Sequence, residues 1–302
     1  MAERIAYDEF SFFHENAAEH GLPYAGPPEV SRERVEVEPG RALSALRWGS
    51  GDPELVLLHG GAQNAHTWDT VALALDRPLI AIDLPGHGHS DGPGDRPSGQ
   101  LSAAGNAEDV ATVVRQLAPE ARGVVGMSLG GLTSIALTEV APSLVRRLVL
   151  VDITPGVTAE RANHITSFVH GPPSFPSFED LLARTMEFNP TRSESSLRRG
   201  ILHNALQQED GTWVWRHARE RAGPWEGGVP DLGPLWETIS RITVPVMLCR
   251  GMRADSVIGD DDEQELRRRL PDVRVERFDQ AGHSIQGDMP VELAAAIQDF
   301  AP

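Results

Sequence analysis

A serine flanked by two glycines stands between a strand-like and a helix-like segment near the middle of the chain. Two valines lead into the pentapeptide Gly-Met-Ser-Leu-Gly at residues 126–130, and a helix-compatible run from Leu132 to Val140 follows. A strand that turns this sharply into a helix strains the backbone of its central residue, and the glycines leave the room that the turn requires. The hydroxyl of Ser128 would stand exposed beside a helix N-terminus, which favours developing negative charge. The pattern predicts Ser128 as a nucleophile.

Short apolar runs alternate with helix-like segments on both sides of this serine. The runs that we predict as buried strands are Leu55–Leu58, Leu79–Ile82, Val124–Val125 with the residues beside them, Val145–Val151, Val244–Cys249 and Val273–Phe278. Residues 35–38 and 42–48 read as a hairpin that precedes them. This rhythm is typical of an α/β fold, with a mostly parallel central sheet and helices on both faces. Right-handed crossovers gather the carboxyl ends of such strands on one edge, where sites form.

The regular alternation of predicted strands and helices ends at residue 155. From there to residue 240, helical segments alternate with breakers and carry four of the six tryptophans. We predict a core of residues 1–154 and 241–302 with a helical cap inserted at 155–240. The cap aromatics either hold a small subdomain together or roof an apolar pocket. Residues 1–34 precede the core, and the aromatic residues from Tyr7 to Phe13 fit a short amphipathic helix whose role stays open.

Composition excludes several classes of function. The net charge is −17, which argues against nucleic acid and anionic membranes as partners. All 27 basic residues are arginine, so Schiff-base chemistry, lysine-bound pyridoxal phosphate and a P-loop lysine are excluded. Cys249 is the only cysteine, so no intrachain disulfide can form, and its apolar surroundings predict a buried core thiol.

The sequence also gives an expectation for the location of the protein and for its partners. No run of about 18 uninterrupted apolar residues is present, and acidic residues rather than an apolar core follow the N-terminus. We therefore expect a cytoplasmic protein without a membrane segment that acts on a small-molecule substrate. The oligomeric state stays open.

Three residues complete a candidate catalytic set. A serine hydroxyl needs a base, usually histidine, and a carboxylate that orients this base. Ser128, Asp255 and His283 follow one another in the order Ser, Asp, His, and each follows a predicted strand, so all three belong to the same edge of the sheet. Asp152 also ends a predicted strand and is the alternative for the acid.

These motifs together resemble the α/β-hydrolase superfamily over about residues 35–300. The matching segments are His59-Gly60-Gly61 with Trp68, Asp83 to Asp91, Gly126 to Gly131, Gly251 to Asp255, and Ala281-Gly282-His283. The resemblance implies Ser128 as nucleophile, His283 as base and Asp255 as acid. It also implies an oxyanion hole from the backbone N–H groups of Gly61 and Leu129, no cofactor and no metal.

The resemblance narrows the reaction without fixing the substrate. Ser128 replaces the aspartate of dehalogenases and epoxide hydrolases of this superfamily, and Ser284 replaces the tryptophan common in its carbon–carbon hydrolases. We expect hydrolysis of an ester, lactone or related acyl bond in a small, fairly apolar substrate. The alternatives are a carbon–carbon hydrolase with the same triad and a non-hydrolytic member: a cofactor-free oxygenase, a lyase or a binding protein. The loop histidines 59, 87 and 89 are expected to form structural turns rather than a metal site.

Overall fold

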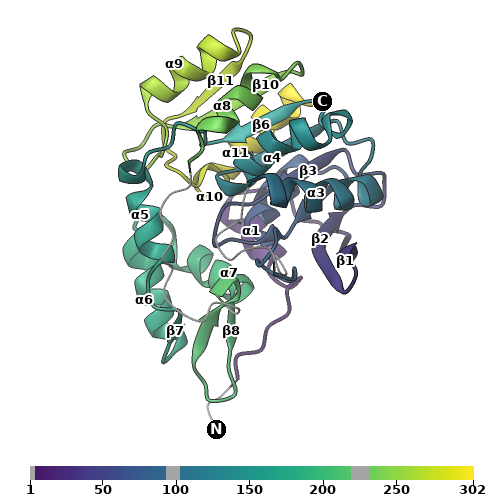
Figure 1. The fold of residues 1–302 in the computed structure, drawn as a ribbon. Coiled ribbons are helices and arrows are strands. Elements are labelled where there is room, and N and C mark those ends of the chain that lie inside the picture. Colours follow the sequence, from purple (N-terminus) through teal and green to yellow (C-terminus); the bar gives the residue numbers. More distant parts are fainter. Residues whose placement is uncertain (1–3, 93–102, 219–230) are drawn as a thin grey trace.

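A single eight-stranded sheet forms the centre of the computed structural model, which describes residues 4–92, 103–218 and 231–302 (Figure 1). The strands lie in the order β1 (Val30–Glu38), β2 (Arg41–Trp48), β4 (Leu79–Ile82), β3 (Leu55–Leu58), β5 (Gly123–Met127), β6 (Leu148–Val151), β10 (Val246–Gly251) and β11 (Arg274–Phe278). The strands from β4 to β11 pair in parallel, whereas the pairings of β2 with β1 and with β4 are antiparallel. The prediction of a mostly parallel α/β sheet is confirmed.

The central strands are short and are buried on both faces. Every residue of β3, β4, β5 and β6 is buried, as the uninterrupted apolar runs predict. Val56 pairs in register with Val124 on one side and with Ile80 on the other. The carboxyl ends of these strands therefore lie together at one edge of the sheet, where the loops that carry the predicted site begin.

Helices cover both faces of the sheet. Apolar side chains of α3 (Ala103–Leu117), α4 (Leu129–Val140), α8 (Gly233–Ser240) and α9 (Asp260–Arg269) share one core cluster, and those of α1 (Phe13–Glu19), α2 (Asp69–Leu75) and α11 (Pro290–Phe300) share the other. Short helical turns complete the core: η1 (Ala65–Trp68), η2 (Pro142–Leu144) and α10 (Ile285–Asp288). No helix among the described residues is both long and apolar enough to cross a membrane.

The N-terminal segment connects the core with the cap. The amphipathic helix expected over Tyr7 to Phe13 begins only at Phe13, because the aromatic residues before it pack on different partners. Phe13 is buried against Trp48 in the core, with ring centroids 4.9 Å apart, whereas Tyr7 and Phe12 pack on the aromatic cluster of the cap. The segment therefore follows the side of the cap before it enters the core (Figure 1).

The inserted segment after β6 forms a separate layer beside the carboxyl edge of the sheet (Figure 1). It contains α5 (Ala159–Val169), β7 (Ser174–Phe175), α6 (Phe178–Phe188), α7 (Glu194–Asn204), β8 (Ala205–Gln207), β9 (Trp213–Trp215) and η3 (Arg216–Ala218). A three-stranded sheet in the order β7-β9-β8 thus accompanies the expected helices. Trp213 and Trp215 are buried in a cluster of the cap itself, and Trp225 lies outside the described residues.

The structure assigns α8 to the core rather than to the cap. Residues 233–240 fall inside the range expected for the cap, but Ile239 is fully buried in the core cluster with Leu235 and Trp236 packed beside it. This helix packs on α4. The chain therefore returns to the core before β10 begins.

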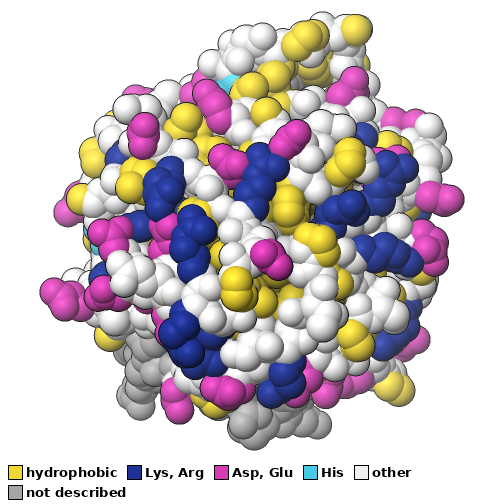
Figure 2. Space-filling view, turned by 90° about the horizontal axis from the view of Figure 1, so that it is seen from above, with side chains coloured by type: hydrophobic (Ala, Val, Ile, Leu, Met, Phe, Trp, Pro, Cys, Tyr) yellow, Lys and Arg dark blue, Asp and Glu magenta, His cyan; other side chains and the backbone are white. Residues whose placement is uncertain are grey.

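The surface carries both signs of charge. Figure 2 shows the upper face of the molecule, where arginine side chains lie among acidic and apolar ones. Ion pairs there include those of Arg268 with Glu265 and of Arg269 with Glu237, at 2.6 and 3.0 Å. The acidic surplus is thus not spread as one continuous field over this face.

Candidate active site

The turn between β5 and α4 has the strained geometry that its sequence predicts. Ser128 precedes α4 with φ 50° and ψ −116°, a conformation that residues with a side chain rarely adopt. A Cβ on Gly126 would overlap the carbonyl of Gly130, and one on Gly130 would overlap the carbonyl of Leu58. Only glycine fits at these two positions, so the sequence locks the serine above the ends of the central strands.

Two backbone N–H groups face no acceptor beside this serine. Leu129 is the first residue of α4, where an N–H has no partner within the helix. Gly61 lies in the loop after β3, and the neighbouring Gly60 approaches Ser128 so closely that a Cβ on it would lie 3.3 Å from the serine Cβ. Among the described residues no acceptor pairs with the N–H of Gly61 or Leu129, whereas the N–H of Ala62 donates to His87 Nε2 at 3.1 Å. Both predicted oxyanion donors therefore have an N–H group available.

His283 is held by Asp152, which the sequence offered only as the alternative acid. The Nδ1 of His283 lies 3.0 Å from Asp152 Oδ2, and the aspartate side chain is fully buried. Asp152 also accepts hydrogen bonds from Gly251 N, Ser256 Oγ and Val257 N at 2.9, 2.7 and 3.0 Å. A buried carboxylate with four donors is fixed in place. It fixes the tautomer of His283 with the proton on Nδ1, which leaves Nε2 to accept a proton.

Asp255, the acid that we predicted, does not reach His283. Its side chain is 41% exposed and pairs with Arg253, with 3.4 Å between Oδ1 and the arginine Nε. Its carboxylate lies against the Cα of Gly282, next to the histidine in sequence, yet the hydrogen bond of Nδ1 goes to Asp152. Asp152 has φ 47°, and its carboxylate is held at the end of β10 by the N–H groups of Gly251 and Val257. No signal in the sequence pointed to Ser256, because its hydroxyl contacts Asp152 only through the folding of two segments that are far apart in the chain.

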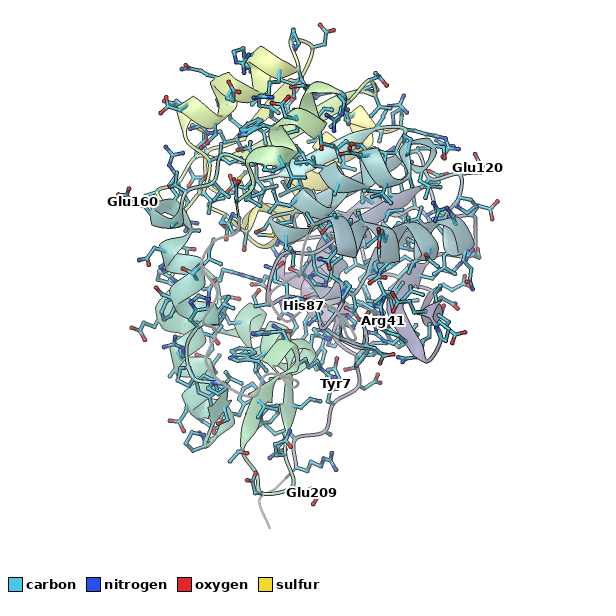
Figure 3. All side chains as sticks on the ribbon, viewed as in Figure 1. Tyr7, Arg41, His87, Glu120, Glu160 and Glu209 are labelled. Carbon is cyan, nitrogen blue, oxygen red and sulfur yellow. The ribbon has the colours of Figure 1, made fainter. Side chains whose placement is uncertain are left out.

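Two of the three loop histidines, His59 and His87, hold the turns of their loops through both ring nitrogens. His59 Nε2 accepts from Leu84 N at 2.9 Å, and burial, reinforced by the neighbouring His87, lowers the pKa of His59 to about 3. Asp83 accepts from Ala65 N and from His89 N at 2.7 and 3.0 Å, which joins the two loops. Figure 3 shows His87 where the core faces the cap. These contacts hold the loop of Gly61 in its place and leave His59 and His87 no free ring nitrogen for a metal.

Cys249 is a core thiol, as its apolar surroundings predict. It is fully buried in β10, and burial raises the pKa of its thiol far above the usual value. A thiol that stays protonated in this way is a weak nucleophile.

A cavity of about 180 Å³ lies between the cap and the core. Its wall includes Ala62 and Ser284, the neighbours of Gly61 and His283, and the cap side chains Phe168 and Trp215. The described cap therefore supplies part of the wall of a cavity that reaches the surroundings of the candidate site, in addition to forming its own aromatic cluster.

Sequence comparison relates the chain to hydrolases of known fold. A model of the alpha/beta hydrolase fold matches residues 53–290. The chain is 43% identical over 309 residues to esterase Rv0045c of Mycobacterium tuberculosis, and the match covers 98% of each chain. It is 30% identical over 261 residues to the sn-1-specific diacylglycerol lipase ABHD11 of Xenopus laevis, covering 82% of this chain and 79% of that protein.

Structural comparison gives the same relationship. A crystal structure of the Mycobacterium tuberculosis esterase Rv0045c superposes with a TM-score of 0.84 and 41% identity, covering 98% of this chain and 99% of that one. The structure of E-2-(acetamidomethylene)succinate hydrolase has a TM-score of 0.74 at 24% identity, which relates the fold alone.

Proposed function

The chain belongs to the α/β-hydrolase family and is a hydrolase, and we propose that it is a serine esterase whose triad is Ser128, His283 and Asp152. The observation that carries this assignment is the 3.0 Å contact between His283 Nδ1 and the buried carboxylate of Asp152, at the edge where Ser128 stands in its strained turn. The likeness to esterase Rv0045c over nearly the whole chain supports an ester as the substrate.

The proposed reaction follows from the roles of these groups. Ser128 Oγ attacks the ester carbonyl while His283 Nε2 takes the hydroxyl proton, and Asp152 stabilises the imidazolium that forms. The N–H groups of Gly61 and Leu129 donate to the carbonyl oxygen as it becomes negative. His283 then gives the proton to the leaving alcohol, which departs from the acyl-enzyme. A water molecule, deprotonated by His283, attacks the acyl group and releases the acid and the free serine.

We expect small substrates with an acyl group that fits a cavity of about 180 Å³. Most of the side chains that line the cavity are polar, among them Gln63 and Asn64, and Phe168 and Trp215 add aromatic surface to its wall. A small acyl group that carries hydrogen-bonding groups matches this lining. Esters and lactones both meet this description.

A fluorophosphonate probe and a substrate panel test the proposal. We expect the probe to label Ser128 in the wild type and to leave Ser128→Ala unlabelled, with labelling slowed in Asp152→Asn. The panel contains p-nitrophenyl esters, lactones and 1,3-diketones. Labelling together with turnover of the diketones alone would replace the esterase by a carbon–carbon hydrolase, and absence of labelling would remove the serine mechanism.

A further inference from the structure

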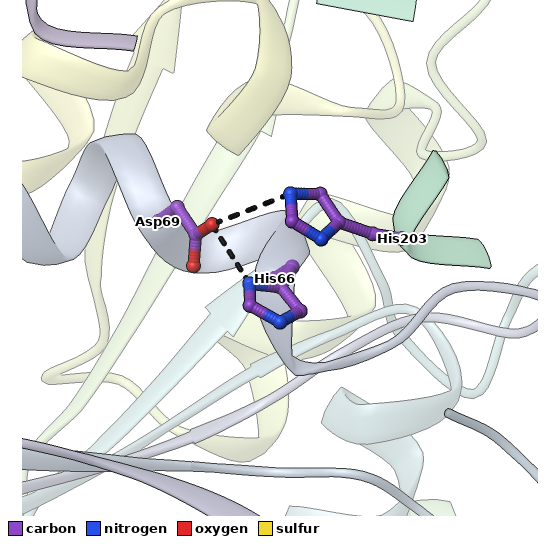
Figure 4. Close-up of side chains that lie close together, drawn as sticks. All are labelled: His66, Asp69 and His203. Atoms are coloured by element: carbon purple, nitrogen blue, oxygen red, sulfur yellow. Dashed lines mark hydrogen bonds and ion pairs between the residues drawn. The ribbon is translucent and has the colours of Figure 1, made fainter. Parts of the chain in front are cut away.

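Three metal-ligating side chains meet where the cap contacts the core. His66 lies in η1, Asp69 opens α2, and His203 lies near the end of the cap helix α7 (Figure 4). All three are buried, and all three line the cavity between the two layers. None of them takes part in the proposed triad.

The three ligand atoms have the spacing of a metal site. His66 Nδ1 lies 2.9 Å and His203 Nε2 lies 3.9 Å from the same Asp69 oxygen, Oδ2, and the three atoms all lie within 4.8 Å of one another. Bonds of about 2.0–2.1 Å to a tetrahedral ion place two ligand atoms roughly 3.3 Å apart. The distance from His203 Nε2 exceeds this value by about 0.6 Å. The rings of His66 and His203 stack with their centroids 3.9 Å apart and 14° between their planes, so the lone pairs of their nitrogens lie in nearly parallel planes. Binding of one ion by both nitrogens therefore requires His203 to turn out of this stack.

Two of the polar atoms in this cluster lack a partner. Among the described residues no hydrogen bond reaches His203 Nε2 or Asp69 Oδ1, although both atoms are buried. An unpaired buried nitrogen and an unpaired carboxylate oxygen cost free energy unless a ligand satisfies them. A cation bound between them would do so.

The opposite nitrogen of each histidine already has an orienting partner. His66 Nε2 lies 3.2 Å from the Glu9 carboxylate, and His203 Nδ1 lies 2.9 Å from the hydroxyl of Tyr7. Figure 3 shows Tyr7 beside the cap, on the segment that joins cap and core. Metal-bound histidines usually carry such a partner on the second nitrogen, because it fixes the ring and its tautomer. The segment of Tyr7 and Glu9 therefore supplies the surroundings that a two-histidine, one-carboxylate site requires.

The nearby charge permits a cation. Three arginines, Arg32, Arg199 and Arg216, lie close enough for their charge to act on His203. Arg32 lies 3.3 Å from His66 Nε2 but is paired with Glu9 at 2.5 Å and with Asp83 at 2.9 Å, and Arg199 is paired with Glu15 at 3.3 Å. The carboxylate of Asp69 remains to face the ion directly. Two imidazoles and one carboxylate match Zn²⁺, Co²⁺ and the other late first-row ions better than Ca²⁺ or Mg²⁺, which take oxygen ligands.

We propose that His66, Asp69 and His203 form a site for a divalent transition-metal ion that fastens the cap helix α7 to the core. The remaining coordination position faces the cavity, where water or a substrate group can occupy it. The ion has no part in attack by the serine. The ion acts by holding α7 in place. Asn204, the residue after His203, donates through Nδ2 to the carbonyl of Ala62, which follows the predicted oxyanion donor Gly61. A fixed α7 therefore also holds the loop of Gly61.

The test uses untagged protein treated with a chelator and then titrated with Zn²⁺ or Co²⁺. We expect one ion per chain, a visible Co²⁺ spectrum typical of four-coordinate nitrogen and oxygen ligands, and a melting temperature that rises with Zn²⁺ and returns when chelator is added. The variants His203→Gln and Asp69→Asn should weaken binding by more than about tenfold, since loss of an outer partner alone costs about that much. His14→Gln, which removes an exposed histidine outside the cluster, is the matched control and should bind like the wild type.

Two results would overturn the proposal. One is wild-type protein that takes up no stoichiometric Zn²⁺ or Co²⁺, a measurement that does not depend on any variant. The other is unchanged affinity in both His203→Gln and Asp69→Asn, which would move the ion elsewhere. Either result leaves the serine mechanism intact, because neither variant touches Ser128, His283 or Asp152.

Discussion

The turns after β6 and after β10 both place an aspartate at the carboxyl edge of the sheet, yet they use it in opposite ways. Asp152, after β6, is fully buried with φ 47° and accepts four hydrogen bonds, one of them from His283. Asp255, after β10, keeps 41% of its side chain exposed and pairs with Arg253. Both aspartates follow strands that end at this edge, and they differ in the hydrogen bonds that surround their carboxylates.

The turn of Asp255 is nevertheless part of the site of Asp152. Gly251, Ser256 and Val257, three of the four donors to Asp152, belong to β10 and the segment after it. A buried carboxylate is stable only where its oxygens are satisfied, and the β10 turn satisfies them with backbone and hydroxyl groups. The β10 turn thus holds the carboxylate of Asp152, while its own aspartate is 41% exposed and forms an ion pair that contributes little.

Removal of the proposed nucleophile should cause the largest loss of activity. Ser128→Ala should lower kcat for a p-nitrophenyl ester by about 10⁶-fold, because the hydroxyl is the atom that forms the bond. The melting temperature should stay at the wild-type value or rise, since alanine removes no hydrogen bond of the serine side chain found among the described residues. Activity within about tenfold of the wild type would remove the role of both aspartates at once.

Neutralising the buried acid should have the next largest effect. Asp152→Asn permits the wrong tautomer of His283 and removes the charge that stabilises its imidazolium, so kcat should fall by about 10³- to 10⁴-fold with little change in KM. Steady-state kinetics measure this split, and the rate of fluorophosphonate labelling of Ser128 should fall in parallel. Asp255→Asn is the matched control, because it makes the same chemical change one turn away. Equal losses in the two variants would contradict the comparison.

The strands of the core could be predicted because their signal is local. The runs at residues 55–58 and 79–82 are uninterrupted and apolar, and the structure has β3 and β4 at these bounds. The elbow around Ser128 is equally local, since two glycines and their flanking strand and helix lie within a short segment. Where residues close together in the sequence determine the conformation, the sequence alone is enough to predict it.

The acid and the histidine cluster could not be predicted in the same way. A positive φ at an aspartate has no signature in a run such as Val151-Asp152-Ile153. The motif at 251–255 favoured Asp255, whereas the hydrogen bond of His283 Nδ1 goes to Asp152. His203 comes to within 3.9 Å of Asp69 across the junction of cap and core, from a position far along the chain. The small sheet of the cap escaped prediction because its strands have only two or three residues. Each of these features depends on contacts between distant segments.

Removal of the Ser256 hydroxyl, in the turn after β10, should have a smaller effect than Asp152→Asn. It donates to Asp152 Oδ1 at 2.7 Å, while the other three donors to the carboxylate come from other groups. Ser256→Ala should therefore lower kcat by only about fivefold, which corresponds to roughly 1 kcal/mol for one hydrogen bond among several. The same kinetic assay measures it, with Ser256→Thr as the variant that keeps the hydroxyl. A loss as large as that of Asp152→Asn would mean that the serine, and not the buried carboxylate, holds the histidine.

Asp255→Asn should have the smallest effect. The substitution removes a carboxylate charge that is 41% exposed, and its partner Arg253 also contacts Asp288 and Thr191. Ion pairs near the surface contribute about 0–1 kcal/mol. Turnover of the p-nitrophenyl ester should stay within about threefold of the wild-type rate, and the free energy of unfolding from urea titration within about 0.5 kcal/mol. Asp255 lies against Gly282, so a small shift of the histidine loop would appear first in KM rather than in kcat. A hundredfold or larger loss of turnover, without loss of stability, would show that the exposed carboxylate turns inward during catalysis, and the acid would then be shared between the two turns.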